Sequence, residues 1–294
     1  MKPWKGVFVA IVTPFKKGVV DHPALKTLVN HLLEGGVRGF IPCGTTGEGS
    51  ALSEDEFISV VETILSQTRG KAMVLPGTGT NSTQKTKERT QLAKKLGTDG
   101  AMVISPYYVK PTQEGLIRHF SEVVETVDFP IMIYNAPLRT AVNILPETIE
   151  KLSTDPRIAA WKECAPYPQV AEIIRRVGQR IAVFTGDDDS YLPTLVLGGA
   201  GVVSVAGNIV PETLAEIWQA VEQADIEEAR RKFLSLLPLI QLLFIESNPI
   251  PVKAAAAYLG WIEDEIRTPL SSLSEPNRKK LFAEVDRLSL RRKK

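Results

Sequence analysis

Lys162 lies near the end of the short apolar segment 158–163, which the sequence predicts to be a buried strand. An ammonium group is costly to remove from water, so a buried lysine either pairs with a carboxylate or loses its proton and becomes a nucleophile. Because side chains alternate along a strand, Lys162 faces away from Glu163, which is badly placed to neutralise it. The alternative is a solvated ammonium on a buried stem.

Eight apolar segments alternate with amphipathic segments between Gly6 and Glu222, and this pattern predicts a closed (β/α)8 TIM barrel. A doubly wound open sheet is the alternative. It would need a glycine-rich dinucleotide turn after its first strand, and the segment 13–15 is not one. The strands are expected at 6–13, 37–43, 71–75, 99–105, 130–134, 158–163, 180–185 and 201–206.

The chain is expected to divide into a catalytic barrel, residues 1–223, and a small C-terminal helical domain, residues 224–294. The second part contains three amphipathic segments, at 226–245, 250–259 and 275–288. Its leucine-rich face carries more apolar surface than one barrel rim needs, so part of it is a candidate subunit contact.

Composition excludes several classes of partner. The formal net charge of +1 over 294 residues gives no electrostatic argument for nucleic acid or membrane binding, and no apolar stretch is long enough to span a bilayer. The 2 cysteines, without a CxxC pair, fit a reducing cytoplasm and argue against a disulfide scaffold or a zinc site. The 3 histidines show no metal-ligand spacing and are predicted at the surface or at helix ends.

The active site of a (β/α)8 barrel lies at the carboxyl ends of its strands. The polar residues there include one candidate nucleophile and several hydroxyls, but no histidine and no carboxylate pair. This set disfavours glycosidase, metal-hydrolase and Ser-His-Asp chemistry. It suits amine catalysis, in which a neutral lysine attacks a ketone and phenols move protons. The residues are Thr45, Thr46, Tyr107, Tyr108, Tyr134, Asn135, Lys162, Gly186, Asp187 and Ser204.

Other interpretations of these motifs are weaker. The turn 44–49 could mimic a phosphate loop, but it lacks the GK[ST] ending. The run 187–189 looks like a metal cluster, and we expect it to cap the helix that follows. Cys43 and Cys164 flank the turn and the lysine, and are predicted to be small buried hydrophobes.

Taken together, six motifs resemble the dihydrodipicolinate synthase / N-acetylneuraminate lyase family of class I aldolases. The resemblance runs in order from about Gly6 to Leu270 and covers nearly the whole chain. The motifs are GTTGE at 44–48, PYY at 106–108, YNAPLRT at 134–140, KE at 162–163, GDD at 186–188 and NPIPVK at 248–253.

The resemblance implies a role for each of four catalytic residues. Lys162 looks like the lysine that forms a Schiff base with pyruvate, and Tyr134 like the proton donor and acceptor for imine formation. Thr45 and Tyr108 look like its proton-relay partners. In the family, the tyrosine at the position of Tyr108 crosses from the neighbouring subunit, so a complete site would need a dimer.

The resemblance also implies the substrate-binding residues. Thr46 looks like the anchor of the pyruvate carboxylate, with the main chain at Val203 lining the pocket together with Gly186. Arg139 looks like the residue that receives the carboxylate of L-aspartate 4-semialdehyde, the second substrate. A guanidinium at that position suits a carboxylated aldehyde and would do little for a neutral sugar chain.

The implied protein is a cytoplasmic enzyme of lysine and diaminopimelate biosynthesis that needs no cofactor and no metal. It would be a homo-oligomer, expected as a tetramer built from dimers that share Tyr108. Two alternatives stay open. One is another pyruvate-dependent aldolase of the family, acting on a sugar acid, hydroxy-oxoglutarate or sialic acid; the other is a non-catalytic scaffold or sensor.

One departure from the family pattern concerns feedback inhibition by lysine at the dimer interface. The inhibited bacterial pattern has histidines where this chain has Glu54 and Phe57, and an acid where it has Lys85. A cationic Lys85 would repel the ammonium groups of the inhibitor. The expectation is weak or absent inhibition at a site near Ser50, Glu54, Phe57, Asn81, Lys85 and Tyr107.

Overall fold

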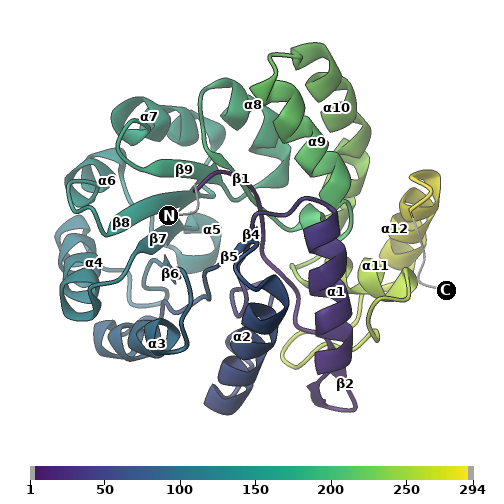
Figure 1. The fold of residues 1–294 in the computed structure, drawn as a ribbon, viewed down its shortest axis with the longest axis horizontal. Coiled ribbons are helices and arrows are strands. Elements are labelled where there is room, and N and C mark those ends of the chain that lie inside the picture. The colour runs from purple at the N-terminus through teal and green to yellow at the C-terminus, as the bar shows by residue number, and fades with distance from the viewer. Residues whose placement is uncertain (1–3, 291–294) are drawn as a thin grey trace. The chain divides into compact units, whose positions relative to one another are not determined.

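The computed structural model describes residues 4–290, in which eight parallel strands alternate with helices (Figure 1). This repeat is that of a (β/α)8 barrel, so the expected fold class is confirmed. The strands are β1 (Gly6–Val9), β4 (Gly39–Phe40), β5 (Met73–Val74), β6 (Ala101–Ile104), β7 (Ile131–Asn135), β8 (Ile158–Glu163), β9 (Ala182–Thr185) and β10 (Gly201–Ser204).

The helices start and end within a few residues of the expected positions. They are α1 (His22–Glu34), α2 (Glu54–Thr68), α3 (Thr83–Lys95), α4 (Gln113–Val127), α6 (Pro146–Leu152), α7 (Tyr167–Val177), α8 (Tyr191–Val196), α9 (Pro211–Glu222), α10 (Ile226–Leu243), α11 (Ile250–Tyr258) and α12 (Glu275–Arg287). Short elements that periodicity did not predict are the hairpin β2 (Phe15–Lys16) and β3 (Val19–Val20), the one-turn helix α5 (Pro137–Thr140), and the 3-10 turns η1 (Asp188–Ser190) and η2 (Ala206–Asn208).

Contacts divide the described chain into two compact units. The first unit contains residues 4–6 and 73–203. Its parallel strands follow the order β10-β9-β8-β7-β6, and α3, α4, α6 and α7 lie on the outside of these strands (Figure 1). Trp161 lies in its core with Phe120 and Ile173. The register pairs Tyr134 with Lys162 and Asn135 with Glu163, so polar residues of neighbouring strands meet at the carboxyl ends.

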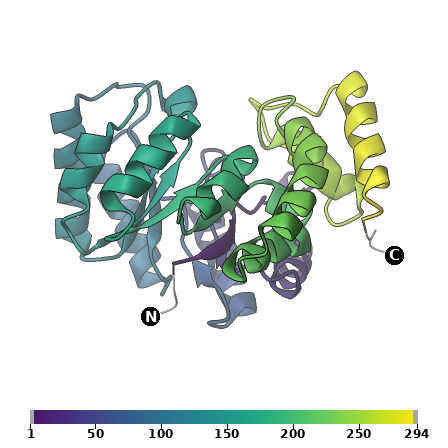
Figure 2. The ribbon, with the colours of Figure 1, turned by 90° about the horizontal axis from the view of Figure 1, so that it is seen from above.

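The second unit contains residues 7–72 and 204–290. β1 pairs in parallel with β4, and α1 packs on α2. The sequence of a capping box, Ser53 with Glu56 three residues later, starts α2: Ser53 Oγ accepts from Glu56 N (3.2 Å) and Glu56 Oε2 accepts from Ser53 N (3.0 Å). Helix α10 packs against α9, α11 and α12 (Figure 2). The predicted domain boundary after residue 223 lies between α9 and α10 and stays a prediction.

A buried ion pair ties the C-terminal helices to the turn after β4. Lys253 Nζ lies 2.6 Å from Glu48 Oε1 and donates to Thr13 O at 3.0 Å. The second carboxylate oxygen of Glu48 accepts from Arg267 N at 2.9 Å. Lys253 Nζ and Arg267 Cζ also lie 4.3 Å and 4.1 Å from the ring centroid of Phe15. The turn that carries the GTTGE motif is thereby fixed by residues more than 200 positions away in the sequence.

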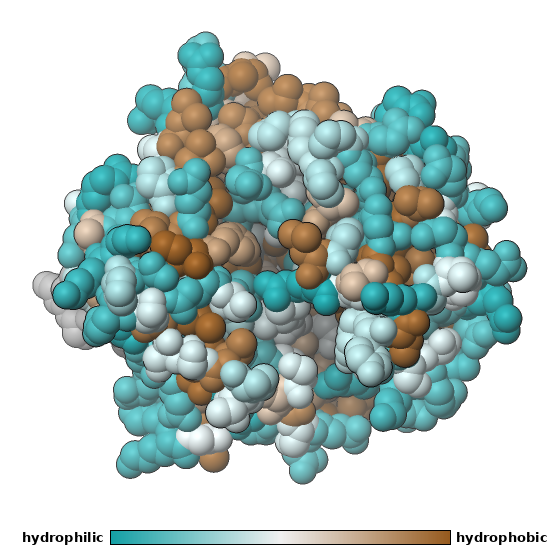
Figure 3. Space-filling model, turned by 180° about the vertical axis from the view of Figure 1, so that it is seen from behind, coloured by the Kyte–Doolittle hydropathy of each residue, from teal (hydrophilic) through white to brown (hydrophobic). Residues whose placement is uncertain are grey.

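Two observations concern the surface. No helix within residues 4–290 is long and apolar enough to cross a membrane, and the face in Figure 3 intersperses hydrophobic residues among hydrophilic ones. The predicted surface or helix-end position is wrong for His119, which lies buried inside α4 with Nδ1 2.9 Å from Thr83 Oγ1. Burial lowers its pKa to about 4, so this histidine is neutral at physiological pH.

Lys253→Met should destabilise the protein by about 3 kcal/mol, because it leaves the buried carboxylate of Glu48 without its ammonium partner. Urea unfolding of wild type and variant measures the change. The control is Lys16→Met, which removes an exposed ion pair to Glu263 and should leave the midpoint unchanged. Equal midpoints for Lys253→Met and Lys16→Met would contradict a structural role of the buried pair.

Candidate active site

Lys162 is buried at the carboxyl end of β8. The residue is 5% exposed. Within residues 4–290, no carboxylate lies within ion-pair distance of its side-chain nitrogen. Nζ lies instead 4.1 Å from the ring centroid of Tyr134. Burial lowers the pKa of Lys162 below its usual value, although the nearby Cys164 and Asp187 act in the opposite direction. Burial therefore shifts Lys162 toward the neutral amine that the predicted nucleophile requires.

Tyr134 stands beside Lys162 on the neighbouring strand β7 and is also 5% exposed. Its hydroxyl accepts a hydrogen bond from the thiol of Cys164, with Sγ 3.9 Å from Oη. Burial raises the pKa of Tyr134 well above its usual value. The phenol thus keeps its proton and can donate it to a group that develops negative charge next to Lys162.

Gly186 follows β9 and leaves room for the lysine side chain. A Cβ at this position would lie 2.5 Å from Lys162 Cε and 2.4 Å from Cys164 Sγ, so any other residue would displace the lysine or the thiol. Two of the residues predicted to lie at the site therefore contact each other because one of them has no side chain.

Asp187 is the next residue, and its predicted role is wrong. It precedes the 3-10 turn η1 and makes no side-chain capping bond to it. Burial raises the pKa of its carboxyl group above the usual value, and the nearby Cys164 thiol acts in the opposite direction. Cys43 is buried as predicted, whereas Cys164 is half-buried and its thiol donates a hydrogen bond to the phenol of Tyr134.

Arg139 lies on α5, the single turn that follows β7. Its side chain is exposed, and its positive charge contributes to lowering the pKa of Lys162. The turn is held by Thr140, which is buried and whose hydroxyl bonds Ala136 O and Val142 O at 3.1 Å and 3.0 Å. The guanidinium is thus free to meet an anion at a fixed distance from the amine.

Tyr108 is placed apart from the buried pair. It is 86% exposed, has a left-handed backbone with φ of 72°, and follows β6. Leu138, which lies on α5 beside Arg139, is 99% exposed. A non-glycine residue in this conformation is strained, and such strain is common where a side chain has a function.

Thr45 and Thr46 belong to the second unit, in the turn after β4. Thr46 is buried, and its Oγ1 accepts a hydrogen bond from Asn248 Nδ2 at 2.9 Å. Asn248 is buried too. The sequence indicated it only as part of the NPIPVK motif and not as a site residue, because its contact with Thr46 joins residues 202 positions apart. Val203, the remaining predicted residue, lies fully buried in β10.

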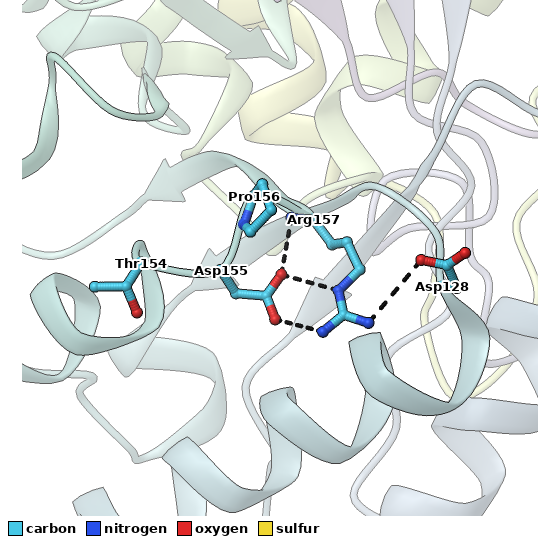
Figure 4. A pocket seen from close by; sticks show the side chains of 5 residues that line it. All are labelled: Asp128, Thr154, Asp155, Pro156 and Arg157. Carbon is cyan, nitrogen blue, oxygen red and sulfur yellow. Dashed lines mark hydrogen bonds and ion pairs between the residues drawn. The ribbon is translucent and has the colours of Figure 1, made fainter.

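A separate shallow hollow is lined by Asp128 and by residues 154–157 (Figure 4). Arg157 fills it with a bidentate pair to Asp155, at 2.9 Å and 2.6 Å. These residues precede β7 and β8, at the ends of the strands opposite to Lys162, where barrel residues contribute to stability. In the described part of the chain, no cluster of three or more His, Cys, Asp or Glu side chains could hold a metal ion.

Comparisons with known proteins show the family of this chain. Residues 3–288 match the model of the "Dihydrodipicolinate synthetase family". A 4-hydroxy-tetrahydrodipicolinate synthase from Thermodesulfovibrio yellowstonii is 47% identical over 283 residues, 96% of this chain and 97% of that protein. The crystal structure of dihydrodipicolinate synthase from Aquifex aeolicus is 41% identical with a TM-score of 0.95, over 99% of this chain and 100% of that one. A monomeric dihydrodipicolinate synthase variant is 39% identical with a TM-score of 0.96, over 98% and 99%.

Cys164 should resist alkylation by iodoacetamide at about pH 8 in the native protein, because burial raises the pKa of its thiol and the thiolate is the reactive form. Peptide mapping by mass spectrometry measures the modified fraction, with protein unfolded in guanidinium as the control. Rapid labelling of native Cys164 would show that its thiol is not held protonated between Tyr134 and Asp187.

Proposed function

The chain belongs to the dihydrodipicolinate synthetase family, and from that premise we propose that it condenses pyruvate with L-aspartate 4-semialdehyde to 4-hydroxy-tetrahydrodipicolinate, a step of lysine and diaminopimelate biosynthesis. The observation that carries the proposal is the buried amine of Lys162, unpaired with any carboxylate in the described chain and 4.1 Å from the Tyr134 ring. A lysine in this setting is an activated nucleophile.

The reaction begins when neutral Lys162 attacks the keto carbon of pyruvate. The carbinolamine oxygen takes a proton and leaves as water, which yields the imine, and Tyr134 is the phenol that supplies this proton. Loss of a methyl proton from the imine gives an enamine, whose carbon attacks the aldehyde of the second substrate. Hydrolysis or ring closure finally releases Lys162 as the free amine.

Thr45 and Tyr108 complete the proton relay with Tyr134. Because Tyr108 is 86% exposed on its own subunit, it is available to a neighbouring one. We therefore propose a homo-oligomer, a tetramer built from dimers that exchange Tyr108. The side chain of Val109, the next residue, is also exposed, which supports a subunit contact there.

Thr46 anchors the carboxylate of pyruvate. Its hydroxyl oxygen accepts a hydrogen bond from Asn248, so its own hydroxyl proton is available to a bound carboxylate. The main chain at Val203 lines the pocket, and Gly186 leaves the lysine room to form the imine. Holding the carboxylate fixes the keto carbon next to the amine, which accounts for much of the rate gain in such reactions.

Arg139 receives the carboxylate of the second substrate. A guanidinium forms two parallel hydrogen bonds with a carboxylate, which favours aspartate semialdehyde over the sugar acids of related aldolases. The enzyme needs no cofactor and works in the cytoplasm. Residues 1–223 form the catalytic barrel in this proposal, and residues 224–294 the helical domain.

Sodium borohydride with pyruvate should trap a covalent adduct on Lys162, detected as a mass increase on the peptide that contains it. Arg139→Ala should keep this adduct but lower kcat/KM for aspartate semialdehyde about 100-fold, through the loss of a charge-assisted bidentate contact. Arg118→Ala, which removes an exposed arginine on α4, is the matched control and should behave as wild type.

Each outcome separates the alternatives. A protein that forms no adduct is the scaffold or sensor, whereas an adduct with better turnover of a sugar-acid aldehyde identifies another aldolase of the family. Unchanged kinetics of Arg139→Ala would remove this residue from the substrate site.

Lysine at millimolar concentration should inhibit the enzyme weakly or not at all, because the exposed Lys85 would repel the ammonium groups of the inhibitor and the buried Phe57 offers no polar group. Initial rates at rising lysine concentration measure this. Strong inhibition in that range would show that the effector site tolerates these substitutions.

A further inference from the structure

Glu163 follows the catalytic lysine and is fully buried, but it makes no ion pair with it. Its carboxylate accepts four hydrogen bonds instead. Oε1 accepts from Ala165 N (2.7 Å) and Asn135 Nδ2 (2.8 Å), and Oε2 accepts from Trp161 Nε1 and Gln169 Nε2, both at 3.1 Å. Every donor comes from a different place: β7, β8, the turn after β8, and α7.

The same network reaches the segment that follows Arg139. Asn143 Oδ1 accepts from Asn135 Nδ2 at 2.8 Å, and Asn143 Nδ2 donates to Gln169 Oε1 at 2.8 Å. Ile144 N donates to Asn135 Oδ1 at 3.0 Å. The chain immediately after α5 is therefore bonded, through two amides, to the carboxylate of Glu163.

The side chain at position 163 has to accept hydrogen bonds from every direction. Four N–H groups converge on Glu163, and an ionised carboxylate is the side chain of this shape that accepts without donating. Burial raises the pKa of Glu163 to about 7, while the four donors favour the charged form. A carboxylate buried at this cost is retained only if the groups that it orders are needed.

We propose that Glu163 is a positioning residue that sets two distances at once: between Lys162 and Tyr134, which precede Glu163 and Asn135 on paired strands, and between this pair and Arg139. The role rests on the proposed function, since it concerns the imine and the second substrate. Glu163 contacts neither, because it faces away from Lys162 along β8.

The first test is Glu163→Gln, which keeps the shape but turns an N–H₂ group toward N–H donors. We expect kcat to fall roughly 10- to 100-fold, with slower borohydride trapping of pyruvate and a higher KM for aspartate semialdehyde, because displacements of about 1 Å cost this much. The matched control is Glu172→Gln on α7, whose carboxylate bonds the surface arginines Arg175 and Arg176 and which should keep wild-type kinetics.

The second test distinguishes the distance within the Lys162–Tyr134 pair from the distance between this pair and Arg139. Asn143→Ala removes the side-chain bonds that join the Arg139 segment to Asn135 and Gln169, while the main-chain bond from Ile144 to Asn135 and the bonds of the four donors to Glu163 remain. We expect a several-fold rise in KM for aspartate semialdehyde, while the rate of pyruvate trapping stays within about twofold of wild type. A residue that only stabilised the fold would lower the melting temperature without separating the two substrates.

The outcomes are distinguishable. Should Glu163→Gln not fold, Asn143→Ala decides by its split between trapping and KM. Wild-type constants in both folded variants, or an equal loss for both substrates in Asn143→Ala, would overturn the positioning role alone. A wild-type protein that forms no pyruvate adduct would overturn the proposed function and this role with it.

Discussion

The free energy of burying the ammonium group of Lys162 is the constraint on which the active site depends. Desolvation disfavours the charged amine, and no carboxylate in the described chain pairs with it to restore the charge. The strand β8 brings the amine into the interior, Gly186 gives it room, and Tyr134 covers it with a protonated phenol. Each of these neighbours keeps the lysine both buried and reactive.

Other buried charged side chains in the protein have ion-pair or hydrogen-bond partners. Lys253 is as deeply buried as Lys162, but it lies 2.6 Å from Glu48 and donates to a main-chain carbonyl. Glu163 is satisfied by four donors. Burial lowers the pKa of both lysines, but the Glu48 carboxylate opposes this shift at Lys253, whereas no carboxylate in the described chain pairs with Lys162.

Local patterns predicted most elements of the fold. The alternation of apolar segments with amphipathic helices indicated the barrel, and the Ser53 capping box marked the start of α2. The errors concern residues whose role depends on distant neighbours. Asp187 was expected to cap a helix and His119 to lie at the surface, but the first meets the Cys164 thiol and the second lies buried beside Thr83. Local spacing carries no information about such contacts.

The sequence by itself determined the order of strands and helices, the position of a lysine at the end of a buried strand, and the motifs of the family, because periodicity and residue type are local properties. Tertiary structure decided in which direction the pKa of that lysine shifts, that residue 186 lies against its side chain, and which side chains surround Glu163. These depend on atoms from segments far apart in the chain, such as Asn135, Gln169 and Gly186, since desolvation and hydrogen bonding act through space.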